Sequence, residues 1–238
     1  SLNSATACAN VTDGDGIDDL AAVMRGAPDI VALPKVAEPD HVRWLDREVA
    51  RFERDCGIAV GSTRLLPNIE FARGLVQTVA IARSSPRVDA CLLASEDLAA
   101  DLGAERGRDG IELAYARQRF LVECVAAGVV AVDAPYTWRD AEGVERDTRW
   151  ARRLGYRAKS LVDPAHAAAA IDLVTARLRA RGRIRGAERM LLTDEAVQQA
   201  TAWPVAALRA RRLAGRDVHD VTCSVGAELG ELVRTADR

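Results

Sequence analysis

The sequence predicts an α/β fold in which the strands of a parallel sheet alternate with helices. From Asp29 to Pro164, short apolar runs alternate with longer segments that have a helical pattern. The runs are apolar at consecutive positions, which is typical of strands that are covered on both faces. Strand–helix alternation of this kind forms a parallel sheet that is either open and doubly wound or closed into a barrel. The residues alone leave both arrangements open.

Proline residues mark the first strand and the first helix of this pattern. The strand Ile30–Leu33 ends at Pro34, and a helix is expected at 40–55, directly after Pro39. Both boundaries are consistent with proline, which cannot donate to a sheet or continue a helix interior. The later strands are expected at 63–69, 88–94, 129–132 and 158–162, and the later helices at 71–84, around Leu98, at 111–127 and at 146–154.

The composition of the chain changes after His166. Alanine and arginine dominate to about Gly186, and a helix is expected at 193–213, where Thr193 offers an N-cap ahead of two acidic residues. The arginine-dense runs 177–189 and 209–216 are expected to be solvated helix faces, and 218–221 is expected to be a short strand. We therefore expect two domains, with the α/β fold in 1–165 and a mainly helical C-terminal extension in 166–238.

Composition and charge exclude several classes of function. Hydrophobic residues make up 49% of the 238 residues and charged residues 29%, which is ordinary for a globular protein with a core. The net charge of −2 provides no basic surface for nucleic acid. The five cysteines are far apart and form no C-x-x-C pair, which indicates reduced thiols in a cytoplasm. No apolar stretch is long enough for a membrane span, so we expect a cytoplasmic protein with neither a nucleic-acid nor a membrane partner.

Two carboxylates stand at equivalent places in successive strand–helix units. Glu70 closes the run 65–69, and Asp97 closes the run 91–95. One strand–helix–strand step separates them, so they are expected to face each other at the carboxyl ends of adjacent strands, where parallel α/β folds place their active sites. A hard cation with oxygen ligands, such as Mg²⁺, fits two carboxylates. An acid at a strand end is also a common helix N-cap, so the residues alone leave a metal site and a helix cap open.

Several segments, taken together, resemble the citrate lyase beta-chain branch of the HpcH/HpaI aldolase superfamily. The segments that carry the resemblance are 33–36, 69–74, 85–89, 95–103, 115–117, 131–136 and 159–164. The resemblance extends from Asn3 to about Ala165. It implies a TIM-type (β/α) barrel that apparently lacks its first two strand units, followed by the helical extension.

The resemblance also implies a chemistry. Its members cleave or form carbon–carbon bonds, often in CoA thioesters of hydroxy acids such as malyl- or citramalyl-CoA, and the residues that match Glu70 and Asp97 hold Mg²⁺. Such a metal acts as a Lewis acid on a keto or hydroxy acid. Backbone N–H groups at Ala94, Ser95 and Glu96, where a helix starts, suit the substrate carboxylate. Lys35 is either a substrate ligand or a member of a structural ion pair. Because related enzymes commonly assemble, a homo-oligomer is expected.

The sequence departs from the family pattern at several positions. Ser1 stands where the family has a substrate-binding arginine, Phe71 replaces a threonine, and Asp163 replaces a histidine. From about Arg177, the segments 189–201 and 220–226 instead resemble the start of a class I S-adenosylmethionine-dependent methyltransferase. Three hypotheses therefore stand side by side: an active lyase, a catalytically impaired relic that still binds metal and keto acid, and a truncated methyltransferase fusion.

Overall fold

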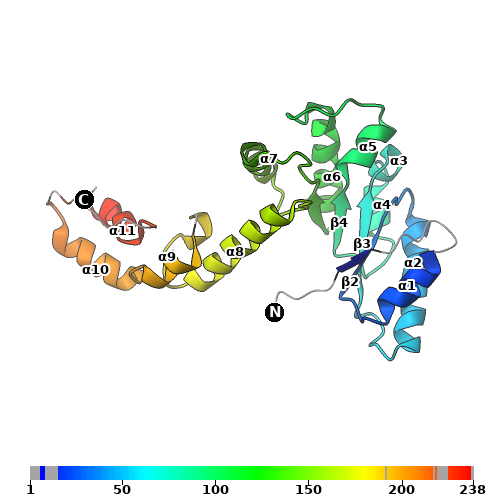
Figure 1. Cartoon of the computed structure of the whole chain (residues 1–238), viewed down its shortest axis with the longest axis horizontal. Coiled ribbons are helices and arrows are strands. Elements are labelled where there is room, and N and C mark those ends of the chain that lie inside the picture. The colour runs from blue at the N-terminus through cyan, green and yellow to red at the C-terminus, as the bar shows by residue number, and fades with distance from the viewer. Residues whose placement is uncertain (1–5, 9–15, 191, 217, 219–224, 237–238) are drawn as a thin grey trace. The chain divides into compact units, whose positions relative to one another are not determined.

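A computed structural model gives the arrangement of the chain (Figure 1) and describes residues 6–8, 16–190, 192–216, 218 and 225–236. The residues aligned with the family arginine, 1–3, and most of the strand expected at 218–221 lie outside these ranges. Two compact units divide the chain, Ser1–Val162 and Asp163–Arg238. The predicted boundary between 165 and 166 falls close to this division and stays a prediction.

The first unit is built on a six-stranded parallel sheet. Its strands are β1 Thr6–Cys8, β2 Ile30–Leu33, β3 Arg64–Ile69, β4 Ala90–Leu93, β5 Val130–Asp133 and β6 Ala158–Lys159. Each strand pairs with the next one along the chain, in the order β1-β2-β3-β4-β5-β6. A doubly wound sheet reverses its strand order at a switch point, whereas a barrel keeps sequential order. The predicted TIM-type barrel fold is therefore confirmed, with these six strands forming the described part of the barrel sheet.

Helices connect the strands of this sheet. They are α1 Gly16–Met24, α2 Pro39–Asp55, α3 Ala72–Leu75, α4 Thr78–Ala82, α5 Ser95–Asp101, α6 Ala114–Ala127, preceded by the 3₁₀ turn η1 Ile111–Leu113, and α7 Ala141–Leu154. The core lies between helices and sheet, where Leu45, Ile69, Leu93 and Phe120 are fully buried. The helix expected at 71–84 is interrupted between α3 and α4, where the Thr78 hydroxyl donates to two carbonyl groups of α3 and so satisfies them locally.

The second unit consists of helices α8 Pro164–Ala180, α9 Asp194–Gln199, α10 Trp203–Leu213 and α11 Ala227–Ala236, with a 3₁₀ turn η2 at Ala187–Arg189. Thr193 is the predicted N-cap and accepts the N–H of Ala196. The expectation of one helix over 193–213 is wrong. Pro204 lies in the first turn of α10, and its ring is incompatible with a helix that continues back to the carbonyl group of Ala200.

The arginines of the runs 177–189 and 209–216 are exposed, apart from the half-buried Arg177, which confirms the expected solvated faces. Arg183 donates to the carbonyl groups of Gln198 and Ala200, and Arg177 donates to that of Met190. These side chains satisfy carbonyl groups where helices end or are interrupted. In the portion of the chain that the structure describes, no helix combines the length and the apolar character needed to cross a membrane.

Candidate functional site

The candidate site lies at the carboxyl ends of β3 and β4. These strands are neighbours, with Ile69 paired to Leu93, and the Ala94 N–H donates to the Ile69 carbonyl oxygen at 3.0 Å. Glu70 therefore follows β3 at the level where β4 ends. Asp97 stands in the first turn of α5, directly beyond β4. The sheet thus brings the two predicted metal ligands to the same edge, as the spacing in the sequence predicted.

The side chains of Glu70 and Asp97 lie against each other. Glu70 is only 5% exposed. Burial, together with the neighbouring Asp97 carboxylate, raises the pKa of Glu70, whereas a hydrogen bond from the Lys35 backbone N–H acts in the opposite direction. One helical turn beyond Asp97, the Asp101 carboxylate accepts the Ala72 N–H at 2.8 Å. This face of α5 is therefore directed at the junction between β3 and α3, where Glu70 stands.

Lys35 occupies an unusual backbone conformation at the end of β2. Its φ angle is 57°, in the left-handed region that non-glycine residues rarely adopt, and its side chain is exposed. Backbone strain of this kind concentrates at functional sites. Among the ion pairs of the described residues, none includes the Lys35 ammonium group. The Lys35 charge nevertheless acts on Glu70, where it opposes the rise in pKa. The substrate role and the structural ion pair of Lys35 both stay predictions.

The predicted substrate-binding residues at the start of α5 differ in whether their backbone N–H groups already have an acceptor in the protein. The Ala94 N–H is occupied by the sheet, whereas the N–H groups of Ser95 and Glu96 lie in the first turn, where a helix offers no intrahelical acceptor. The buried Ser95 hydroxyl is 3.4 Å from the Pro135 carbonyl oxygen. A ligand at this point would thus meet backbone donors of Ser95 and Glu96, and the substrate roles of Ala94, Ser95 and Glu96 stay predictions.

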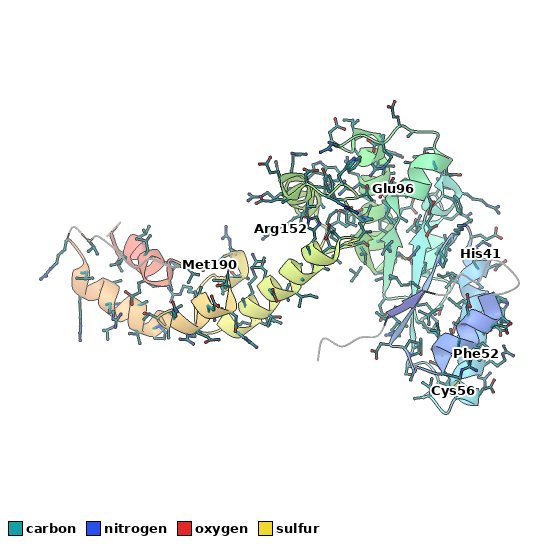
Figure 2. The ribbon with its side chains drawn as sticks, in the orientation of Figure 1. His41, Phe52, Cys56, Glu96, Arg152 and Met190 are labelled. Atoms are coloured by element: carbon teal, nitrogen blue, oxygen red, sulfur yellow. The ribbon has the colours of Figure 1, made fainter. Side chains whose placement is uncertain are left out.

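The Glu96 carboxylate itself is engaged by side chains from two loops. Arg106 donates to Glu96 Oε1 through Nε at 3.2 Å and Nη2 at 3.1 Å, and Thr137 Oγ1 donates to the same oxygen at 2.9 Å. Partial burial opposes ionisation, but Arg106 and Thr137 outweigh it and lower the pKa of Glu96. Figure 2 labels Glu96 among the side chains of this part of the first unit. Oε1 of Glu96 therefore holds protein groups from both loops.

A second cluster of charges at the strand ends was missed by the sequence reasoning. Asp133, the last residue of β5, is fully buried and accepts two hydrogen bonds from Arg117, at 2.9 and 2.6 Å. Lys159 on β6 donates to Asp133 at 2.8 Å, and both cations also contact Asp147 on α7. Asp133 stands at a strand end, like Glu70 and Asp97, and this shared placement was the available signal. Two carboxylates and two cationic side chains neutralise each other here, so the cluster is a structural ion-pair network and offers no free carboxylate to a metal ion.

Oxygen ligands suit magnesium at the Glu70–Asp97 pair. Over the described ranges, there is no group of three or more His, Cys, Asp or Glu side chains arranged to hold a metal ion. Mg²⁺ is commonly bound by one or two carboxylates and completes its octahedral shell with waters and ligand oxygens. The raised pKa of Glu70 reflects its burial and the neighbouring Asp97 carboxylate, and a cation would relieve both by favouring the ionised form. The residues present therefore fit a magnesium ion.

Comparison with known proteins identifies relatives of the first unit. The family model described as HpcH/HpaI aldolase/citrate lyase matches residues 9–164. Citrate lyase subunit beta of Escherichia coli (strain K12) is 37% identical over 157 residues, which are 65% of this chain and 52% of that protein. The chain thus spans about half the length of the curated relatives it matches.

Solved structures resemble the same part of the chain. RipC from Yersinia pestis has a TM-score of 0.59 and 30% identity, covering 67% of this chain and 71% of that one. CitE from Mycobacterium tuberculosis in complex with magnesium and pyruvate has a TM-score of 0.56 and 26% identity, covering 67% of this chain and 63% of that one. A different relative, an uncharacterized S-adenosylmethionine-dependent methyltransferase of Mycobacterium tuberculosis (strain CDC 1551 / Oshkosh), is 51% identical over 74 residues, which are 29% of this chain and 21% of that protein.

Proposed function

The chain belongs to the HpcH/HpaI aldolase/citrate lyase family, and on that premise we propose that it acts as a Mg²⁺-dependent carbon–carbon lyase or aldolase. The substrate class we propose is a keto acid or hydroxy acid, free or as its CoA thioester. The observation that carries the proposal is the adjacency of Glu70 and Asp97 at the carboxyl ends of neighbouring parallel strands. Pyruvate and magnesium are bound together by the similar CitE of Mycobacterium tuberculosis, which supports the substrate class.

Each residue of the site has a proposed task. Glu70 and Asp97 would hold Mg²⁺, which when bound supplies Lewis-acid stabilisation of negative charge on a ligand oxygen. The first-turn N–H groups of Ser95 and Glu96 bind and orient the substrate carboxylate, because they carry the partial positive charge of the helix start. The exposed Lys35 ammonium group, held at the end of β2 by a strained backbone, adds a second positive group for an acidic substrate.

The charged groups of the site also support an alternative proposal, in which the chain binds its ligands without catalysis. A chain that binds magnesium and keto acid through these residues without turning substrate over is the catalytically impaired relic, and the same contacts support binding in both cases. Turnover separates the two. Release of a keto acid from a hydroxy-acid CoA thioester, measured after magnesium binding is established, supports the lyase; binding without release supports the relic.

The first experiment is a calorimetric titration of Mg²⁺ into the purified chain, with and without pyruvate. We expect saturable binding that Glu70→Ala and Asp97→Ala each weaken strongly or abolish, because either substitution removes one of the two charged ligands. Glu105→Ala is the matched control, since Glu105 is an exposed acid on the loop after α5. Equal binding by the wild type and both site variants would contradict the metal site.

A specific similarity favours a second candidate function for the second unit. The 51% identity over 74 residues to a methyltransferase supports S-adenosylmethionine binding as the alternative to a purely structural tail. Asp220, which would begin the cofactor site, lies outside the described residues. Calorimetry with S-adenosylmethionine tests this candidate: saturable binding supports it, and no heat of binding leaves the tail as a packing element.

We also propose that the chain forms a homo-oligomer. Large apolar side chains on the outward face of α6 support this proposal, because exposed apolar surface of that kind marks interaction sites.

A further inference from the structure

Two loops of the first unit meet at Glu96. One is the loop 102–110, between α5 and η1, and the other is the loop 134–140, between β5 and α7. Arg106 comes from the first loop and Thr137 from the second, and both donate to the same oxygen, Oε1 of Glu96. Glu96 is the residue directly before the proposed metal ligand Asp97. One carboxylate oxygen thus joins both loops to the helix turn that carries the metal site.

Further contacts join the two loops directly. The Arg106 guanidinium group lies over the Trp138 ring, 4.9 Å from its centroid, and Trp138 packs against Tyr136 at 5.2 Å. Arg108 donates to Asp140 at 3.2 Å, and the Tyr136 hydroxyl donates to the same carboxylate at 2.8 Å. Arg106 also pairs with Glu112. We call Glu96 and the loops 102–110 and 134–140 the Glu96 clasp.

The space beneath the clasp is too small for an organic ligand when the loops meet. The cavity there has a volume of about 20 Å³ and is lined by Ser95, Arg106, Trp138, Arg117 and Asp147, among others. That volume holds about one water molecule. Any larger molecule that enters from this side must therefore separate the two loops.

The clasp is built to open at low cost. The Glu96 side chain is 53% exposed and that of Arg106 is 18% exposed, so water reaches the pair from the Glu96 side and the pair contributes about 1 kcal/mol. Local opening of exposed loops requires far less free energy than global unfolding. The buried cluster of Arg117 and Asp133 beneath it stays fixed, because breaking buried charge pairs is costly.

We propose that Glu96 is a positioning residue that latches the loops 102–110 and 134–140 over the end of β4, and that this latch must release for an organic ligand to reach Ser95 from the side of the loops. Through its place beside Asp97, the closed latch also holds the first turn of α5 in register with Glu70. Only this last consequence rests on the proposed magnesium site; the latch itself rests on the contacts of the loops.

Limited tryptic cleavage of the full chain, followed by mass spectrometry, tests the latch. The first loop carries two tryptic sites, Arg106 and the exposed Arg108, and the second carries the exposed Arg139; the products after Arg106 and Arg139 are followed, with cleavage after Arg181 in the other unit as the internal reference. Glu96→Ala should raise the cleavage rates after Arg106 and Arg139 about fivefold, as expected from losing about 1 kcal/mol of loop contacts. Glu188→Ala is the control and should change neither rate, since Glu188 is an exposed acid outside both loops.

Variants that remove the contact of only one loop to Glu96 distinguish a latch from a general destabilisation of both loops. Glu96→Gln keeps an acceptor for Thr137 but loses the ion pair, so cleavage should rise after Arg106 and not after Arg139. Thr137→Val should have the reverse effect, and Thr137→Ser, which retains the hydroxyl, should restore the wild-type rate. Unchanged cleavage at both sites in Glu96→Ala, or equal rates in Thr137→Val and Thr137→Ser, would overturn the latch. Circular dichroism melts verify that every variant is folded.

Magnesium titration of Glu96→Ala tests the link to Asp97. We expect affinity several-fold weaker than that of the wild type, whereas Glu105→Ala should bind as the wild type does. Wild-type affinity in Glu96→Ala overturns the positioning role. If the wild-type chain binds no magnesium while the cleavage rates respond as described, the proposed function fails and the latch stands.

Discussion

At the scale of single residues, the buried ion pair of Glu53 and Arg87 bears on stability. Glu53 on α2 is fully buried and accepts two hydrogen bonds from Arg87, at 2.8 and 2.7 Å. The N–H groups of Gly61 and Thr63 also donate to this carboxylate, at 2.8 and 2.9 Å. With four donors, the buried charge is fully satisfied. Removal of one partner leaves the other charge buried without compensation, which is the costly event.

Arg87→Met tests this pair. We expect the free energy of unfolding to fall by about 3–5 kcal/mol, because Glu53 remains in the interior without its cation. Arg43→Met is the matched control: Arg43 pairs with an exposed aspartate, Asp40, and its loss should cost at most about 1 kcal/mol. Urea unfolding monitored by circular dichroism measures both. Similar losses in the two variants would show that burial of the pair contributes little.

The same pair predicts a pH dependence. Burial acts to raise the pKa of Glu53, but Arg87 and the two N–H donors outweigh it and hold the pKa below the ordinary value of 4.5. The unfolded chain therefore takes up the proton first, so the pair's stabilisation is complete above about pH 4.5 and is lost as the pH falls through the lower folded-state pKa.

Glu53→Gln removes this titration. We expect the variant to be less stable than the wild type at pH 7, and the difference to shrink as the pH falls below about 4.5, where the wild type also loses its charge. Thermal melts of both proteins across this pH range measure the difference. A gap that stays constant with pH would mean that the Glu53 charge is not what stabilises the folded state.

At the scale of elements, one glycine sets how closely α3 approaches the loop after β2. A Cβ atom at Gly74 would lie 2.3 Å from the Val36 carbonyl oxygen, which no real contact allows. That loop carries Lys35, whose N–H hydrogen-bonds to Glu70. The glycine of the segment 69–74 is therefore needed for close packing of backbone on backbone and connects helix packing to the site.

Gly74→Ala tests this close approach. We expect a loss of about 1–3 kcal/mol in the free energy of unfolding, because the methyl group forces the loop away, together with weaker Mg²⁺ binding. Gly230→Ala is the matched control on α11, where the nearest atom to an added Cβ is 4.0 Å away. Alanine favours a helix over glycine by up to about 1 kcal/mol, so this control should be neutral or stabilising. Destabilisation in the control alone would contradict the packing argument.

The elements also show what the sequence was able to predict. The apolar runs located β2 to β6, because buried parallel strands are apolar throughout, and the spacing of Glu70 and Asp97 placed both at one edge. The pairing of Glu53 with Arg87 was not predictable, since the partners are distant in the chain and charged residues are normally assigned to solvent. Lys35 was recognised as a strand-end residue, but a left-handed φ angle at a lysine has no local sequence signal.

At the scale of the whole molecule, the outward face of α6 is the feature that bears on assembly. Four large apolar side chains here are between 67% and 76% exposed: Ile111 on the preceding turn η1, and Tyr115, Val122 and Val125 on α6. With Gln118 between them, they follow one another at intervals of three and four residues, as in a helix–helix interface. The helices α4 and α7 flank α6. Arg83, at the end of α4, donates to the Ala126 carbonyl group on α6, and Arg117 on α6 donates to Asp147 on α7. Neighbouring barrel helices therefore leave this face uncovered.

Val122→Glu tests whether this face holds two copies together. We expect the wild type to sediment as a homo-oligomer and the variant as a smaller species, because a charge in the centre of an apolar seam must be desolvated on association. Val60→Glu is the matched control, since Val60 is an exposed valine on the loop after α2, away from α6, and it should keep the wild-type mass. Sedimentation equilibrium measures all three. A wild type that is monomeric at every concentration would remove the homo-oligomer, and an oligomer that Val122→Glu leaves intact would place the interface on another face of the molecule.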